Sequence, residues 1–229
     1  MRGVSIAIWA FFGSLLLLEE RLQLRDHVEI LGAAGGAFED NKAPQRNTQK
    51  VDAIDGYAVS NLPVFAATGV DTRFLLFSSY GLTFSGIGLI TRQATVKSDP
   101  QLCTAMAVGL LKGLRDCLVQ PDSSLELFFK EVPEIAASAT ARKQSHIGLG
   151  IFCTSMLSEI PKKHGLGFAP PEDYEAMIDL TMEYAADKAD VRPKVADVVT
   201  NESIGSVKMS DAEWSKAAAS LAEFTPYLR

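Results

Sequence analysis

Two short segments of the sequence combine glycine with polar side chains in a way that could hold a small molecule. At Phe12-Gly13-Ser14 an apolar run ends and a run of helix-forming residues begins. Backbone amides and the positive end of a helix could bind an anionic or polar group there. Asp55-Gly56-Tyr57 follows an apolar stretch, and ligand contacts in α/β folds gather after strands. From spacing alone, ordinary turns are the more frequent outcome for such segments.

Motifs of established catalytic classes are missing from the sequence. It has no Gly-x-Ser-x-Gly elbow, no phosphate loop with Gly-Lys-Ser/Thr and no His-Glu-x-x-His zinc helix. The three histidines, His27, His146 and His164, lie far apart, and we expect surface or hydrogen-bonded roles for them. The glycine-rich residues 31–38 do not match a dinucleotide fingerprint, because no helical pattern follows them. We therefore expect no catalytic residue, no metal site and no cofactor.

The cysteines share no metal-ligand or redox spacing. Cys103 and Cys117 are expected on one helix, where a rise of 1.5 Å per residue separates them by about 21 Å. That separation is far beyond the reach of a disulfide. We expect Cys103, Cys117 and Cys153 to be small core residues.

The composition of the chain argues against nucleic acid as a partner. The chain has 229 residues and a formal net charge of -6, with a pI near 5.1 and a mean hydropathy of +0.10. Nucleic-acid binding needs a basic face, which this balance does not favour. A chain of this length and hydropathy can bury a real hydrophobic core, as one large domain or two lobes.

The first 24 residues allow three interpretations: a secretory signal, a membrane span, or a strand followed by a helix. No Ala-x-Ala-like cleavage site follows the apolar run, and the run is shorter than the roughly 20 residues that a membrane helix needs. Residues 4–9 are β-branched and aromatic, whereas residues 15–24 are helix formers, with Ser14 as a plausible N-cap. We expect strand, turn and helix, and no direct membrane insertion.

The expected secondary structure changes along the chain from strands alternating with helices to helices alone. Five apolar, strand-like segments spaced by helical patterns predict βαβ units and a mainly parallel sheet, at residues 4–9, 28–32, 51–57, 73–77 and 86–91. A short helix is expected at residues 62–68. Asp99-Pro100 is a helix start signal, and Ser210 with Glu213 fits a capping box. The later helices are expected at residues 99–120, 124–132, 140–157 and 171–189, and after Ser210.

A series of short motifs along the chain resembles those of a known family. They are Arg2-Gly3-Val4-Ser5-Ile6, Gly13-Ser14, Lys50-Val51-Asp52-Ala53, Ser79-Tyr80-Gly81, Asp99-Pro100 and Val199-Thr200-Asn201-Glu202. Ser79 stands where the family pattern has an acid. In this order they are similar to the solute-binding proteins of ABC importers for nitrate, sulfonates, taurine and thiamine-type pyrimidines. The same family includes the fungal pyrimidine synthases.

The resemblance implies an α/β, type II periplasmic-binding-protein fold. Residues 2–76 would form a complete α/β lobe two, and residues 77–229 the remainder of lobe one with its C-terminal helices. The family carries a leading segment before the position of Met1, so we expect an incomplete, helix-rich first lobe and a truncated frame or wrongly assigned start. Apolar surface left open in that lobe would favour association.

The resemblance also implies a function, which is capture of a small organic solute by hinge closure as the substrate-binding component of an ABC importer. Ser14 and nearby amides would bind a polar group, Tyr57 and Tyr80 would pack on the ligand's flat face, and Asp55 would accept hydrogen bonds. The expected ligand-binding residues are Phe12, Gly13, Ser14, Asp55, Gly56, Tyr57 and Tyr80. Asp55 favours an amine or pyrimidine over a simple sulfonate.

The expected partners and the competing roles come from the same resemblance. We expect an ABC permease as partner, no nucleic acid and no enzymatic activity. The expected location is periplasmic or extracytoplasmic, or cytoplasmic if Met1 is the true start. The alternatives are a thiamine-pyrimidine biosynthetic enzyme of the same family, which would use pyridoxal phosphate, and a truncated non-transport remnant. The sequence lacks the cysteine cluster that the enzyme branch carries.

Overall fold

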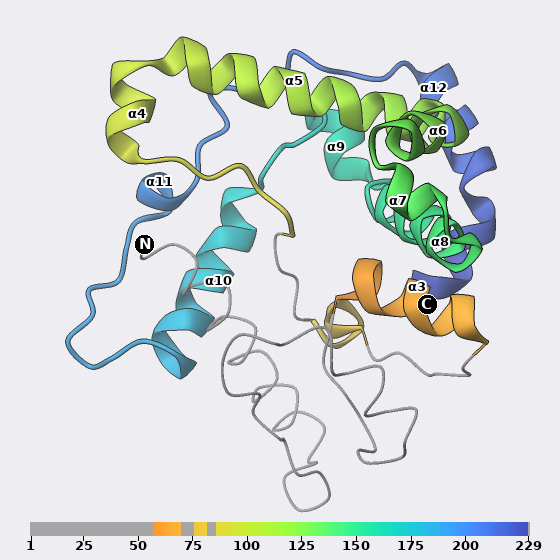
Figure 1. Ribbon diagram of the computed structural model, residues 1–229. Helices are drawn as coiled ribbons and strands as arrows, with labels where there is room; N and C mark the ends of the chain where they lie inside the picture. The colour runs from red at the N-terminus through yellow and green to blue at the C-terminus, as the bar shows by residue number, and fades with distance from the viewer. Residues whose placement is uncertain (1–56, 70–75, 82–85, 229) are drawn as a thin grey trace, which may run out of the picture. The chain divides into compact units, whose positions relative to one another are not determined.

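The described part of the protein is helical. A computed structural model describes residues 57–69, 76–81 and 86–228, and within them there is no strand (Figure 1). The α-helices are α3 (Ala58–Thr68), α4 (Gln93–Ser98), α5 (Pro100–Val119), α6 (Pro121–Glu131), α7 (Pro133–Ala136), α8 (Ala139–Ser155), α9 (Glu159–His164), α10 (Pro171–Tyr184), α11 (Val195–Val198) and α12 (Asp211–Ser220). Two 3₁₀-helices are also present, η1 (Phe77–Tyr80) and η2 (Ala222–Leu228).

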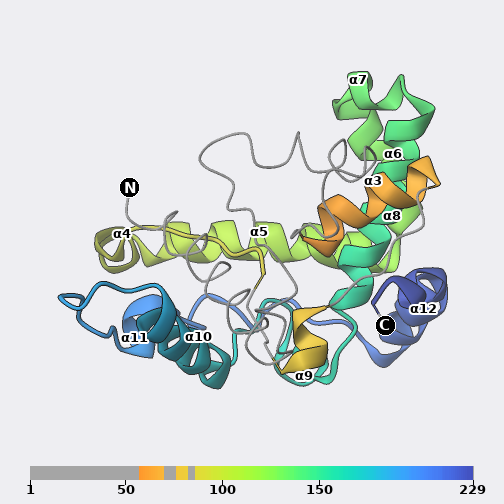
Figure 2. The ribbon, with the colours of Figure 1, turned by 90° about the horizontal axis from the view of Figure 1, so that it is seen from below.

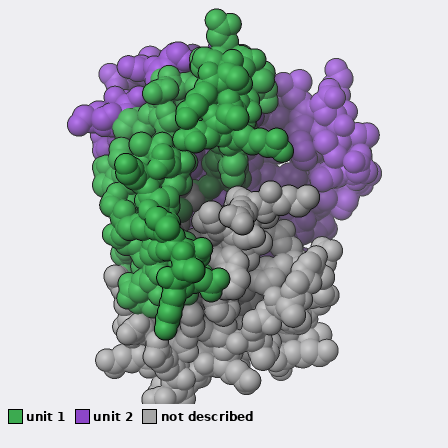
Figure 3. Space-filling model, turned by 90° about the vertical axis from the view of Figure 1, so that its left-hand side faces the viewer, with its two compact units in different colours: residues 1–31, 75–107, 167–204 green, residues 32–74, 108–166, 205–229 purple. Residues whose placement is uncertain are grey.

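The chain divides into two compact units, which Figure 3 colours separately. Unit 1 comprises Met1–Leu31, Leu75–Ala107 and Gly167–Ile204, and unit 2 comprises Gly32–Phe74, Val108–Leu166 and Gly205–Arg229. Helix α5 runs from one unit into the other. The lobe boundary expected at residue 76 from the family resemblance stays a prediction.

Helix α5 begins where its start signal predicts. The Asp99 carboxylate accepts a hydrogen bond from the Leu102 backbone amide at 3.0 Å, which satisfies one amide of the first turn. Pro100 is the first helical residue, where its missing N–H costs nothing. Figure 2 shows α4 turning directly into this end of α5. The predicted helices at residues 99–120, 124–132 and 140–157 are all confirmed, to within a few residues, as α5, α6 and α8.

The core of unit 2 forms where α3 lies along α8, as both ribbon views show (Figures 1 and 2). Leu62 of α3 packs on Ile147 and Ile151 of α8, and all three are buried. Pro63 has no N–H, so the Val59 carbonyl lacks its usual helical partner. A Cβ at Gly148 would lie 3.1 Å from that carbonyl oxygen, so the absence of a side chain at Gly148 lets the helices approach closely.

A second glycine of α8 accommodates the C-terminal segment. A Cβ built on Gly150 would lie 2.4 Å from the ring of Phe224, which belongs to η2. Phe224 is buried, and its ring also meets the His146 imidazole edge-on, with centroids 5.2 Å apart. The ring of Phe224 therefore occupies the space that a side chain at Gly150 would need.

Helix α6 is attached to α8 through one arginine. The guanidinium carbon of Arg142 lies 4.0 Å from the ring centroid of Phe129, and its Nη2 donates to Glu126 Oε1 at 2.9 Å. Both ion-pair partners are largely exposed, so the pair contributes at most about 1 kcal/mol. Arg142 orients α6 on α8, and the burial of the Phe129 side chain supplies most of the stabilisation of this helix pair.

Helix α12 has the capping box that its sequence predicts. The Ser210 hydroxyl accepts from the Glu213 amide at 3.3 Å, and Glu213 Oε2 accepts from the Ser210 amide at 2.8 Å. The other carboxylate oxygen of Glu213 accepts from Arg115 Nη2 of α5. Arg115 Nε is buried and has no hydrogen-bond partner. The cap of α12 is thereby tied to α5 within unit 2.

Several predicted elements differ from the structure: the helix predicted at residues 62–68 begins earlier, at Ala58, and Phe77, at the end of the strand predicted at residues 73–77, opens η1 instead. Helix α10 ends at Tyr184 instead of near residue 189, because the Thr181 carbonyl accepts from both Ala185 and Ala186 amides and closes the helix. Residues 86–91, predicted as a strand, form neither strand nor helix. Ile87 and Ile90 are 86% and 77% exposed. The strand prediction is wrong because the apolar pattern indicated burial that these side chains do not have.

Candidate functional site

The structure describes two of the seven predicted ligand-binding residues. Tyr57 and Tyr80 are described, whereas Phe12, Gly13, Ser14, Asp55 and Gly56 lie outside the described residues. The role of those five residues stays a prediction. Tyr57 belongs to unit 2 and Tyr80 to unit 1, so their expected meeting on one ligand also stays a prediction.

Tyr57 stands at the start of α3. Its backbone is extended, at φ -85° and ψ 134°, and its carbonyl accepts from the Asn61 amide at 2.9 Å and the Ser60 amide at 3.2 Å. The first turn of α3 contains no acidic residue. Tyr57 is 54% exposed although Leu62 and Phe65 of the following helix are buried. An exposed ring at the start of a helix suits a flat ligand that carries hydrogen-bond acceptors.

Tyr80 closes the short helix η1. Gly81 follows it at φ 78° and donates its amide to the Ser78 carbonyl at 3.2 Å, which ends the helix. Ser78 and Ser79 are exposed, whereas Tyr80 is half-buried. The left-handed conformation at Gly81 explains why glycine follows the tyrosine. The local turn therefore fixes the backbone from which the Tyr80 ring projects.

Asn201 has a positioning role that reasoning from the sequence missed. Its side-chain amide clamps the backbone of Ala169, because Oδ1 accepts from the Ala169 amide at 2.9 Å and Nδ2 donates to the Ala169 carbonyl at 2.8 Å. The Thr200 hydroxyl accepts from the Glu202 amide at 3.2 Å and shapes the turn around it. The Thr-Asn-Glu motif marked this segment, but only the fold reveals a partner 32 residues away.

A segment in the first part of the chain matches a known protein family. Residues 36–124 match the protein family described as NMT1/THI5 like. This segment is similar to that family. The family comprises ABC-type nitrate, sulfonate and taurine binding proteins and thiamine pyrimidine synthesis proteins, so the resemblance drawn from the motifs is confirmed over these residues. No curated protein and no solved structure matches the chain.

The NMT1/THI5-like segment contains four of the predicted ligand-binding residues. Asp55, Gly56, Tyr57 and Tyr80 fall within it. Phe12, Gly13 and Ser14 precede it, and Asn201 follows it. The family fits a periplasmic-binding-protein fold, and the described residues of this chain are mostly helical. The α/β lobe expected at residues 2–76 stays a prediction.

The cysteines and His146 support structural roles. Burial raises the pKa of the Cys153 thiol to about 12, with a smaller contribution from Cys117, so Cys153 is a neutral thiol near pH 7 and a poor nucleophile. All three cysteines are free, with Cys103 and Cys117 half-buried. His146 packs edge-on against Phe224. Burial of Cys153 agrees with the core role expected for it.

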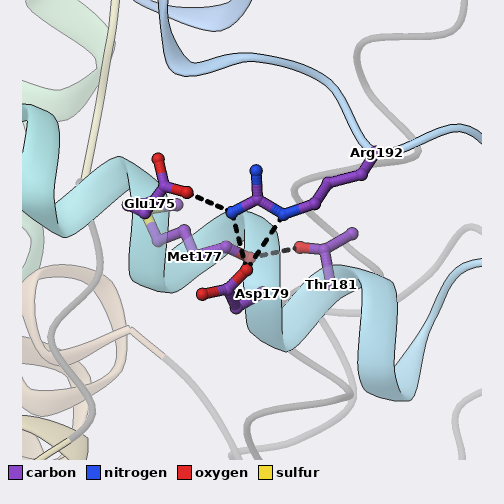
Figure 4. Close-up of polar contacts among 5 residues, drawn as sticks. All are labelled: Glu175, Met177, Asp179, Thr181 and Arg192. Atoms are coloured by element: carbon purple, nitrogen blue, oxygen red, sulfur yellow. Dashed lines mark hydrogen bonds and ion pairs between the residues drawn. The ribbon is translucent and has the colours of Figure 1, made fainter.

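Two acidic side chains of α10 and Arg192, which follows this helix, form a compact ion-pair cluster, shown in Figure 4. Arg192 donates to Asp179 Oδ1 from Nε at 3.1 Å and from Nη2 at 2.7 Å, and Nη2 also donates to Glu175. Hydrogen bonds to Asp179 and then Glu175 raise the pKa of Arg192. Glu175 and Asp179 are one helical turn apart and would repel each other without this cation. The cluster ties the segment after α10 to the helix.

The described residues contain neither a cluster of metal ligands nor a helix that could span a membrane. No cluster of three or more histidine, cysteine or acidic side chains lies close enough there to hold a metal ion. None of the helices described is both long and apolar enough to cross a membrane.

Proposed function

We propose that this chain binds a small organic solute and acts as a substrate-binding component of an ABC importer. The match of residues 36–124 to the NMT1/THI5-like family carries the proposal, since that family includes ABC-type binding proteins. In this role the chain works outside the cytoplasm and delivers its solute to a permease. It captures the solute without converting it.

The aromatic side chains favour a flat ligand within the range that the family covers. Tyr57 presents a half-exposed ring at the start of α3, and Tyr80 follows in the same matched segment. Asp55 would accept hydrogen bonds from an amino group. We therefore propose an aminopyrimidine of the thiamine-precursor type as the preferred ligand, ahead of taurine, other sulfonates and nitrate.

A thermal-shift screen tests the ligand class. The full chain is titrated with an aminopyrimidine, taurine, an alkanesulfonate and nitrate, each over the same concentration range. A ligand that binds only the folded state raises Tm, and the stabilisation grows with the logarithm of its concentration once that exceeds Kd. We expect the aminopyrimidine to give the largest rise and Asp55→Asn to reduce it. Stabilisation by sulfonates alone, unchanged in Asp55→Asn, would overturn the ligand preference.

Turnover separates binding from catalysis. The chain is incubated with the stabilising ligand, with and without pyridoxal phosphate, and the ligand is followed by mass spectrometry. We expect the ligand to be recovered unchanged and no pyridoxal absorbance to remain with the protein after gel filtration. Conversion of the ligand, or pyridoxal phosphate retained in stoichiometric amount, would favour the pyrimidine-synthesis branch of the family.

A further inference from the structure

Helix α5, the longest of the described helices, has an exposed apolar face. It is one continuous helix of 20 residues (Figures 1 and 2). Leu111 and Leu118, seven residues apart on one side of it, are buried. On the opposite side Leu102 is 50%, Met106 51% and Leu110 56% exposed. Large apolar side chains that adjoin one another on a helix face and stay exposed mark a surface for association.

Two glycines continue this face toward the C-terminal end of α5. Gly109 and Gly113 follow Leu102 and Met106 at steps of four, three and four residues, the alternation typical of a seam between two packed helices. We call these four residues the α5 seam. A Cβ on either glycine would meet nothing within 4 Å among the described residues. Glycine weakens a helix relative to alanine, and no contact that the structure describes requires it at these two positions.

The order of large and small residues along the α5 seam is self-complementary. Leu102 and Met106 come first along the helix, and the two glycines follow. A twofold axis through the middle of the seam places Met106 of one copy opposite Gly109 of a second copy, with the helices antiparallel. The same axis places Leu102 opposite Gly113. Each large side chain then lies over a glycine, whereas a parallel pair would set the large side chains against each other.

Charge and area agree with a second copy as the occupant. The seam residues are uncharged, so two chains of net charge -6 meet there without like charges in direct contact. Leu110 flanks the seam and extends the apolar contact along one side. Contact along a single helix is smaller than the about 800 Å² per partner of a standard stable interface. The area therefore predicts a weak dimer that dissociates on dilution.

We propose that the α5 seam is the contact surface of a homodimer, in which the α5 helices of two copies pack antiparallel about a twofold axis. This inference is independent of the solute-binding role.

Sedimentation velocity of the full chain tests the proposal, at protein concentrations from about 1 μM to about 1 mM, where weak dimers dissociate. Gly109→Met places a side chain where Met106 of the second copy would lie. The double variant Met106→Gly/Gly109→Met exchanges the large and the small residue, which restores one of each in every facing pair. Apart from this exchange the double variant has the composition of the wild type.

The expected result depends on the register. The wild type should dimerise with rising concentration, and Gly109→Met should raise the dimer dissociation constant about tenfold or more, because it overfills the seam. The double variant should return to within about threefold of the wild type. A wild type that stays monomeric up to about 1 mM, a Gly109→Met variant that dimerises as well as the wild type, or a double variant as weak as Gly109→Met would overturn the proposal.

A matched pair of glutamate variants keeps the test decisive if Gly109→Met fails to fold. Met106 and Leu127 are 51% and 64% exposed, but Leu127 belongs to α6, outside the seam. Met106→Glu would bury a charge against the second copy and should abolish dimerisation. Leu127→Glu should dimerise like the wild type. Equal dimerisation in the two variants would show that the α5 seam is not the contact surface.

Discussion

The Glu213 carboxylate takes part in two interactions, the capping box of α12 and the ion pair with Arg115. Hydrogen bonds from the Ser210 amide and hydroxyl lower its pKa below the ordinary value of 4.5, and Arg115 adds to the effect. The spacing of Ser210 and Glu213 predicts the capping box from sequence alone. The partner Arg115, 98 residues earlier in the chain, follows only from the packing of α12 beside α5.

The lowered pKa predicts a loss of stability in acid. The folded state holds the charged Glu213 more favourably than the unfolded state, so its contribution is complete above pH 4.5 and is lost as pH falls through the folded pKa. Glu213→Gln keeps the capping geometry but removes the charge. The variant should have a lower Tm than the wild type at pH 7, and the difference should shrink below pH 4.5.

The matched control for this prediction is Glu131→Gln, at the exposed end of α6. It removes one negative charge without touching α12. We expect Glu131→Gln to follow the wild-type pH profile of Tm. A Glu213→Gln profile parallel to that of the wild type from pH 7 to pH 3 would contradict the role assigned to the Glu213 charge.

At the scale of elements, local signals predict the helices well, because capping residues and prolines act within one turn. Asp99-Pro100 and Ser210-Asp211-Ala212-Glu213 both begin helices. The strand predicted at residues 86–91 is wrong, since a strand depends on a partner that its own sequence does not specify. The clamp of Asn201 on Ala169 also required the fold, because it joins distant segments.

The surroundings of two helical glycines, one on α8 and one on α5, predict opposite effects of alanine on stability. Gly150→Ala would place a Cβ 2.4 Å from the Phe224 ring, and overpacking of this kind costs about 1–3 kcal/mol. Gly113→Ala on α5 meets nothing within 4 Å and should gain about 0.5–1 kcal/mol through the better helix propensity of alanine. Urea unfolding measures both free energies of unfolding. A Gly150→Ala variant as stable as the wild type would contradict the packing.

At the scale of the whole molecule, the sequence indicates a family more clearly than it indicates a site. The order of short motifs led to the same family that residues 36–124 match. The seven predicted ligand-binding residues could not be assembled in the same way, because a pocket depends on how distant segments pack. Tyr57 and Tyr80 show the difference, since each has a defined local conformation while their joint role stays a prediction.

Isothermal titration calorimetry of the full chain with an aminopyrimidine tests the solute-binding proposal most directly. Tyr57→Ala removes the exposed ring, Tyr57→Phe keeps it, and Leu127→Ala on the exposed face of α6 serves as a surface control. Stacking of an aromatic side chain on a base is worth about 1–3 kcal/mol. We predict saturable one-to-one binding that Tyr57→Ala weakens about tenfold or more, with Tyr57→Phe and Leu127→Ala close to the wild type. Absence of saturable binding to the wild type, or equal affinity in Tyr57→Ala, would contradict the account.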